Sequence, residues 1–156
     1  MSKKTNAIRL LDSNKINYKL MSYDAPDGFL DGVSVALATG VEPARVFKTL
    51  VTQGTSKEYY VCIVPVALEL DLKKAAKFFK EKKLEMIPSK GITKVTGYIK
   101  GGCSPISMKK QYKTAIDISA SDFDYIVVSA GKVGLQVELS VSDLIKITNA
   151  HLVDLK

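Results

Sequence analysis

The sequence holds few of the residues and motifs that enzyme active sites usually depend on. It has one histidine, His151, and two cysteines, Cys62 and Cys103, whose spacing matches neither a metal site nor a disulfide framework. It also lacks a His-Glu zinc motif, a GxSxG nucleophile elbow, a phosphate-binding loop and a pair of carboxylates at helical spacing on one apolar face. We therefore expect free thiols, a surface histidine, no metal and no cofactor. Any enzyme chemistry must then rely on backbone donors, a lysine and the substrate itself.

Long apolar runs are absent as well. No segment approaches the ~20 apolar residues of a membrane span, and no apolar core follows the lysines near the N-terminus. These absences predict a cytoplasmic protein without a membrane segment. With 156 residues, 46% hydrophobic and 25% charged, the chain is expected to form one globular domain over residues 1–156. The formal net charge of +7 favours a polyanionic partner such as nucleic acid.

Hydrophobic periodicity and turn residues predict the secondary structure. Helices are expected at 5–13, 32–39, 72–83 and 88–95 and after Ser140, and strands at 16–23, 46–52, 58–64, 84–87, 115–118, 125–129, 134–139 and 151–153. In helix 32–39, we expect Val33, Ala36 and Leu37 to face inward. Two predicted hairpins favour a mixed, mostly antiparallel sheet that curls like a barrel, with peripheral helices, so the fold class is α+β.

The lysines of helix 72–83 lie opposite its apolar stripe. This arrangement is typical of a solvated helix face, which is the interpretation we favour. The alternative is a face that runs along a nucleic-acid backbone and attracts it without reading its sequence. The lysines concerned are Lys73, Lys74, Lys77 and Lys80.

Two features indicate a binding site. Gly101 and Gly102 let a backbone reach dihedrals closed to other residues and let another molecule approach closely, while Pro105 restricts the residue before it. Such a loop presents N–H donors to an oxyanion, although it also suits a plain tight turn. Lys48 stands among apolar residues of a predicted strand, where it is either an outward lysine or a fixed charge facing a cleft.

Five motifs in the same order along the chain resemble the YbaK/EbsC family, whose members hydrolyse mischarged aminoacyl-tRNA and typically deacylate Cys-tRNA(Pro). The motifs are Val46-Phe47-Lys48-Thr49-Leu50, Leu70-Asp71-Leu72-Lys73-Lys74-Ala75-Ala76, Gly97-Tyr98, Gly101-Gly102-Cys103-Ser104-Pro105 and Ser129-Ala130-Gly131-Lys132-Val133-Gly134-Leu135. The resemblance covers nearly the whole chain. It implies the fold of the YbaK and prolyl-tRNA synthetase editing domains.

The resemblance also implies a site. Lys48 would face the pocket and hold the tRNA end or the ester, and main-chain groups of Gly101 and Gly102 would orient that ester. The remaining positions expected to contact the substrate are Tyr23, Phe29, Thr49, Cys103, Ser104 and Ser129. The chain departs from the family pattern at four positions. Relatives commonly have an aliphatic residue at Cys103, a glycine at Ser107, an arginine at Val133 and an aspartate at Gln136.

The implied substrate is the 3′ aminoacyl end of a mischarged tRNA, and prolyl-tRNA synthetase is an implied docking partner. In cysteine-specific relatives, the thiol of the substrate is thought to attack its own ester, which would make the reaction that of a lyase if the thiol cyclises. Other interpretations stay open: a deacylase for another small amino acid such as alanine, a non-catalytic RNA-binding accessory domain, and a hydrolase with Cys103 as nucleophile. Monomer and homodimer are both open.

Overall fold

The computed structural model describes residues 4–24 and 31–156. Its α-helices are α1 (Asn6–Ser13), α2 (Gly32–Thr39), α3 (Leu72–Phe79), α4 (Ile92–Thr96) and α5 (Val141–Thr148). Its strands are β1 (Tyr18–Ser22), β2 (Phe47–Gly54), β3 (Tyr59–Pro65), β4 (Leu84–Met86), β5 (Lys113–Asp117), β6 (Tyr125–Lys132), β7 (Leu135–Ser140) and β8 (His151–Val153). Short 3-10 helices are η2 (Pro43–Arg45), η3 (Ser89–Gly91) and η4 (Ile118–Asp122).

The strands form two sheets. One has the order β1-β7-β6 and is antiparallel, and the other has the order β4-β2-β3-β5-β8. In the second sheet β3 pairs with β5, and β5 with β8, in parallel, while β2 is antiparallel to both its neighbours. The predicted α+β class and the mostly antiparallel pairing are confirmed. The sheet does not close into a barrel within the described residues, and an isolated bridge between Val46 and Val127 links the two sheets.

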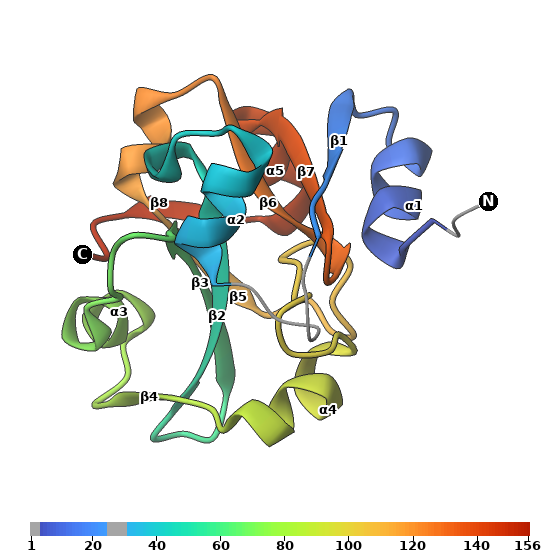
Figure 1. The fold of residues 1–156 in the computed structure, drawn as a ribbon. Helices are drawn as coiled ribbons and strands as arrows, with labels where there is room; N and C mark the ends of the chain where they lie inside the picture. The colour runs from blue at the N-terminus through green and yellow to red at the C-terminus, as the bar shows by residue number, and fades with distance from the viewer. Residues whose placement is uncertain (1–3, 25–30) are drawn as a thin grey trace.

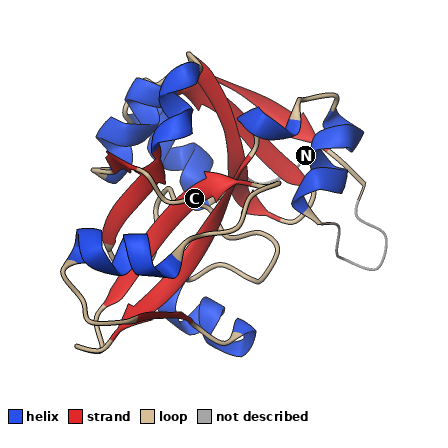
Figure 2. Cartoon of the chain, turned by 90° about the vertical axis from the view of Figure 1, so that its left-hand side faces the viewer, coloured by secondary structure: helices blue, strands red, loops and turns tan. Residues whose placement is uncertain are grey.

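The helices cover these sheets on their outer faces. Figure 1 shows α1 beside β1, and α2 in front of β2 and β3, while Figure 2 shows α3 lying across the five-stranded sheet. A large apolar core joins α1 and α5 to both sheets through residues such as Ile8, Ile63 and Leu139. A second cluster lies between α3 and the five-stranded sheet, and a small third cluster lies under α2. Within the described residues, no helix is long and apolar enough to cross a membrane.

Side-chain caps start the helices where the sequence predicts them. Thr5, Asp31, Asp71 and Ser140 each accept a hydrogen bond from a backbone N–H of the first turn. These bonds satisfy donors that have no partner inside the helix, so the starting residue is encoded locally.

Two details of the predicted helices are wrong. Helix α3 ends at Phe79 and not near 83, because Lys80 takes a left-handed φ of 61° and its N–H, like that of Glu81, caps the helix. On α2, Leu37 points to solvent with 72% of its surface exposed, whereas Ala36 is buried as predicted and Val35 is buried in addition.

Candidate functional site

A cavity of about 340 Å³ lies where the start of β2 meets α2, the glycine loop and the β6–β7 hairpin. In Figure 1 the yellow loop that holds the glycines lies below the ends of β1 and β7. The cavity is within the size range of small-molecule sites. The described residues that line it are Tyr23, Asp31, Gly32, Val35, Phe47, Lys48, Thr49, Leu50, Val66, Ile92, Lys100, Gly101, Cys103, Ser129 and Gln136.

Strand β2 carries Lys48 and Thr49 into this lining. The strand is held in place by antiparallel pairing, in which Lys48 lies opposite Val64 and Thr49 opposite Ile63. Lys48 is half-buried and makes no ion pair with any described residue. Because Lys48 lines the cavity and is half-buried, its position fits the cleft-facing interpretation of the sequence better than the solvent-facing one.

Gly101 and Gly102 differ in their surroundings. Gly101 has a φ of +85° and lines the cavity. Its N–H donates to no described residue, so it can serve as an oxyanion donor. Gly102 is buried against the hairpin: a Cβ there would lie 2.9 Å from the backbone N of Val133, and its own N–H donates to the carbonyl of Ile99 at 3.0 Å. Gly102 therefore shapes the loop and is not brought to the cavity.

The residues after the glycines also separate. The Cys103 side chain lines the cavity, whereas Ser104 is fully buried and its Oγ accepts a hydrogen bond from the N–H of Ile106. Burial raises the pKa of the Cys103 thiol to about 11, against a smaller opposing effect of the Thr96 hydroxyl. At neutral pH the thiol is protonated, and a protonated thiol is a poor nucleophile.

Tyr98 holds the loop in this position. Its hydroxyl donates to the carbonyl of Ile106 at 2.5 Å, and its ring lies close to Gly131, where a Cβ would be 2.8 Å from ring atom Cε1. Burial raises the pKa of Tyr98 to about 12, so the hydroxyl remains a donor over the physiological range. The loop and the β6–β7 hairpin are thereby fixed as one wall of the cavity.

The C-terminal end of β1 and the C-terminal half of β6 bring Tyr23 and Ser129 to the same cavity. The N–H of Tyr23 donates to the carbonyl of Gly134 at 3.0 Å, which ties the end of β1 to the hairpin turn. Ser129 accepts a hydrogen bond from the N–H of Gly131 and lies opposite Gln136 in the antiparallel pairing. Phe29, the remaining predicted contact residue, lies outside the described residues.

The structure adds Gln136, Lys100 and Asp31 to the predicted site residues, and it leaves a polar atom of the predicted contact residue Thr49 without a partner. Within the described residues, Thr49 Oγ1 and Gln136 Oε1 are buried without a hydrogen-bond partner, and both residues line the cavity. Lys100 adds a second cation and Asp31 one carboxylate, whose pKa is lowered by hydrogen bonds from Ser34. Buried groups without partners are uncommon, so a ligand that supplies their hydrogen bonds would be favoured. The burial of these two oxygens and their lack of a partner result from tertiary packing, which the sequence does not show.

Together these groups allow one kind of chemistry. The lining offers two cations, a free backbone donor, small polar groups and one carboxylate, but no ionised thiol. Among residues 4–24 and 31–156, no cluster of three metal-binding side chains occurs. The arrangement can hold an anionic, carbonyl-containing ligand and stabilise negative charge on its oxygen.

Comparisons with known proteins point in the same direction. A sequence profile described as the aminoacyl-tRNA editing domain matches residues 33–147. Over 152 residues, the chain is 43% identical to EbsC of Enterococcus faecalis, which is described as a candidate Cys-tRNA(Pro)/Cys-tRNA(Cys) deacylase. That match covers 97% of this chain and 93% of the relative.

Solved structures show the same fold at low sequence identity. One is described as a candidate trans-editing enzyme for prolyl-tRNA synthetase; it is 22% identical, with a TM-score of 0.85 and 99% of each chain covered. A second, described as a hypothetical protein, is 17% identical, with a TM-score of 0.85 and coverage of 95% of this chain and 97% of that one.

Proposed function

The chain belongs to the aminoacyl-tRNA editing domain family, and we propose that it acts in trans to hydrolyse the ester of a mischarged aminoacyl-tRNA. In this proposal, Cys-tRNA(Pro) is the preferred substrate. The whole chain, residues 1–156, would act as one editing domain. The observation that carries the proposal is the cavity that brings Lys48 of β2 together with Gly101 of the glycine loop. The description of the 43% identical relative supports the choice of amino acid and tRNA.

Lys48 and Gly101 take separate roles in this proposal. The Lys48 ammonium attracts the 3′ end of the tRNA and holds the ester at the mouth of the cavity. The Gly101 N–H donates to the carbonyl oxygen, where negative charge develops during attack. Thr49 Oγ1 and Gln136 Oε1 would hydrogen-bond polar groups of the aminoacyl-adenosine end, a role supported by their lack of a partner in residues that line the cavity. No group of the protein is required to form a covalent bond.

The nucleophile in the proposed reaction is the thiol of the substrate cysteine. Its sulfur bonds to the ester carbonyl carbon, the bond to the ribose oxygen breaks, and the thiol proton passes to that oxygen. Water then opens the resulting thiolactone. Cys103 does not compete for this role, because burial keeps its thiol protonated. If alanine is the substrate instead, the same backbone donor would serve a direct attack by water.

Selection against larger amino acids would come from the limited size of the cavity. Val35, Val66 and Ile92 contribute apolar walls. An apolar pocket discriminates between amino acids that differ by a single methylene by only about 10–200-fold. The chain is therefore expected to accept several small amino acids, with different rates.

The test is a time course of deacylation with Cys-, Ala- and Ser-tRNA(Pro), with and without prolyl-tRNA synthetase. The proposal expects the fastest hydrolysis for Cys-tRNA(Pro), and the Lys48→Ala protein serves as the inactive control. Binding of charged tRNA without any turnover would instead identify an RNA-binding accessory domain. A rate increase with the synthetase would support it as a docking partner.

A further inference from the structure

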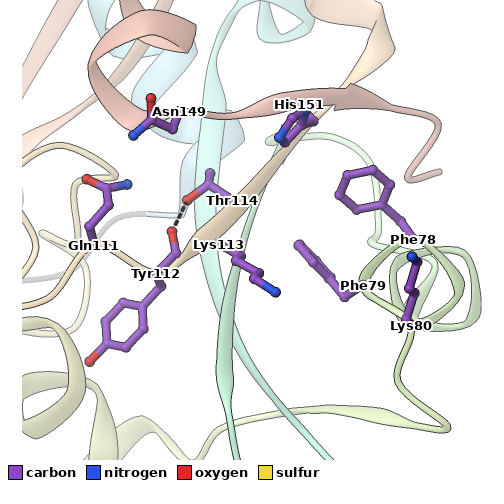
Figure 3. A pocket seen from close by; sticks show the side chains of 9 residues that line it. All are labelled: Phe78, Phe79, Lys80, Gln111, Tyr112, Lys113, Thr114, Asn149 and His151. Atoms are coloured by element: carbon purple, nitrogen blue, oxygen red, sulfur yellow. Dashed lines mark hydrogen bonds between the residues drawn. The ribbon is translucent and has the colours of Figure 1, made fainter.

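A second and larger cavity, of about 450 Å³, lies at the edge of the five-stranded sheet. It forms because β8 is shorter than β5: β8 pairs with Ala115–Asp117 only, so Lys113 and Thr114 have a neighbouring strand on one side, β3. The end of α3 and the start of β8 enclose this gap, as Figure 3 shows. The cavity shares no lining residue with the first one.

Aromatic side chains from three elements surround this cavity. The Phe78 ring lies 5.1 Å from the Phe79 ring and 5.8 Å from the His151 ring, measured between centroids. Phe78 remains 37% exposed although its neighbour Phe79 is buried against Tyr60. Tyr112 stands on the far side, as Figure 3 shows. Exposed ring faces next to a cavity are surfaces on which a planar group can stack.

Positive charge lies beside these rings. Lys80 and Lys113 line the cavity, and the Lys110 ammonium is 6.0 Å from the centroid of the Tyr112 ring. No aspartate or glutamate is among the described residues of the lining. Glu81 is near Lys113, and hydrogen bonds from the hydroxyls of Ser56 and Tyr60 lower its pKa, so its carboxylate stays charged and offsets part of this positive charge. Lys80, Lys110 and Lys113 still outnumber this one carboxylate. The cavity is therefore suited to bind an anion.

Two amides at the other end of the cavity add hydrogen-bonding groups. Figure 3 shows Gln111 and Asn149 on the side opposite the phenylalanines. Gln111 donates through Nε2 to the carbonyl of Thr148 at 2.7 Å, which fixes the amide and leaves its oxygen as an acceptor. Amides of this kind hydrogen-bond the edges of nucleobases in RNA-binding proteins.

We propose that this cavity binds an unpaired ribonucleotide of an RNA chain, with the base stacked on Phe78 and the phosphate held by Lys113 and Lys80. Stacking surface, cations and fixed amides are the three features by which proteins bind single-stranded nucleotides. An extended peptide could pair with the free edge of β5, but it would not use the cations. The charge of the lining therefore favours RNA.

The inference rests on the proposed function in one respect: the RNA is taken to be the tRNA whose 3′ end enters the first cavity. The route from Lys48 along β2 to Thr52, then across β3 to Lys113, covers four residues and two strand spacings. At ~3.3 Å per residue and ~4.8 Å per strand, the Cα atoms of Lys48 and Lys113 are roughly 16 Å apart. The bound nucleotide is thus a different one from the terminal adenosine.

The direct test is a titration of the full-length protein with a fluorescently labelled, unstructured 12-nucleotide RNA. The variants are Phe78→Ala and Lys113→Ala, and the matched controls are Leu20→Ala and Lys19→Ala, an exposed apolar residue and an exposed lysine of β1. We expect Phe78→Ala to raise Kd by about fivefold or more, because stacking on one aromatic ring contributes that much per base. Lys113→Ala should reduce the salt dependence by about one phosphate contact. The controls should stay within twofold of the wild type.

A second measurement separates this inference from the proposed function. With charged tRNA as substrate, both variants should raise KM and leave kcat unchanged, whereas an aminoacylated CCA trinucleotide should be hydrolysed at the wild-type kcat/KM. If the protein proves to have no deacylase activity, the RNA titration still decides whether the cavity binds nucleotides. Thermal unfolding checks folding, and the exposed Lys113→Glu charge reversal provides a further test if Phe78→Ala does not fold.

Wild-type RNA affinity in Phe78→Ala, Lys113→Ala and Lys113→Glu overturns the proposal. Unchanged RNA affinity together with lost binding to prolyl-tRNA synthetase would assign the cavity to a protein partner instead.

Discussion

At the scale of single residues, Lys48 is the side chain on which the proposed activity depends most. We expect Lys48→Ala to lower the deacylation rate roughly 10²-fold, comparable to the loss of one group that stabilises charge in a transition state. Stability should change by no more than about 0.5 kcal/mol, because Lys48 is half-buried and makes no ion pair with a described residue. Single-turnover kinetics and urea unfolding of the same preparation give the two numbers.

Lys19→Ala is the matched control for Lys48→Ala, since Lys19 is a strand lysine outside the cavity. Lys48→Arg is a stricter probe, because a planar guanidinium does not reproduce a compact ammonium in a small site. A folded Lys48→Ala protein with wild-type kinetics would remove Lys48 from the site.

Cys103 lies in the same cavity, but its chemistry is different. Because its thiol is protonated at neutral pH, Cys103→Ala should retain most of the deacylation rate toward Cys-tRNA(Pro). Mass spectrometry of the wild-type protein quenched during turnover should find no acyl group on Cys103. An acyl-enzyme, or complete loss of activity in a folded Cys103→Ala protein, would show that the protein supplies the nucleophile.

The buried thiols also affect stability at alkaline pH. Burial raises the pKa of Cys62 from 9.0 to about 12, so above pH 9 the unfolded chain loses this proton while the folded protein keeps it. The stabilising effect is complete below pH 9 and is lost as the pH rises toward 12, at a slope of up to about 1.4 kcal/mol per pH unit. Urea unfolding at pH 8 to 10.5 should therefore show a shallower decline for Cys62→Ala than for the wild type. Parallel declines would mean that Cys62 does not titrate in this way.

At the scale of elements, the two glycines of the glycine loop have different roles, although the sequence predicts the same role for both. Gly101→Ala places a side chain at a φ of +85°, which costs on the order of 1 kcal/mol, and it also disturbs the donor that lines the cavity. Gly102→Ala brings a Cβ to 2.9 Å from the backbone of Val133, so it should cost more stability and force the hairpin to move. We expect Gly101→Ala to reduce the rate per folded molecule 10²-fold or more, and Gly102→Ala to act mainly on the melting temperature.

Gly101→Asn makes this comparison sharper. Asparagine tolerates the left-handed region, so the variant keeps the backbone conformation while adding a side chain beside Val133 at a residue that lines the cavity. Its stability should be close to that of the wild type and its activity low. If both Gly101 variants keep their rate per folded molecule, the loop is a turn and the oxyanion donor lies elsewhere.

The helices also show which structural features are determined by the local sequence. The starts of the helices with a side-chain cap agree with the prediction, because a cap such as Asp71 or Ser140 needs only its own first turn. The helix expected at 88–95 has no such cap, and it is a 3-10 turn followed by α4 from Ile92. The end of α3 differs from the prediction, because Lys80 is not a usual left-handed residue and the chain turns there to bring Glu81 to Ser56 and Tyr60. The exposure of Leu37 depends on which face of α2 meets the sheets, and its local pattern does not define that face.

The same distinction holds for the candidate site. Residues in the lining that come from a strand pattern or a family motif, such as Lys48, Gly101 and Ser129, are brought together as the sequence suggests. Gly102 and Ser104 are not, because their positions follow from packing against the hairpin and the loop interior. The second cavity has no sequence signal, since it results from the shorter length of β8 relative to β5.

At the scale of the whole molecule, part of the positive charge of the chain lies around the two cavities. Lys48 and Lys100 line the first cavity, and Lys80 and Lys113 the second. Both cavities adjoin the sheet that contains β2, β3 and β5, so a bound RNA chain would cross this sheet from one group of lysines to the other. The net charge of +7 then serves the attraction of a polyanion and not solubility alone.

This arrangement predicts how salt affects the reaction. For full-length charged tRNA, log(kcat/KM) should fall linearly with log salt concentration, with a slope of about −0.7 to −0.9 for each phosphate contacted. An aminoacylated CCA trinucleotide reaches only the first cavity, so its slope should be smaller by at least one phosphate. Lys113→Ala should reduce the slope for tRNA and leave the slope for the trinucleotide unchanged, while Lys19→Ala should affect neither. Equal slopes for the two substrates would mean that only the terminal nucleotides of the tRNA are bound, and the lysines around the second cavity would then be no more than a solvated surface.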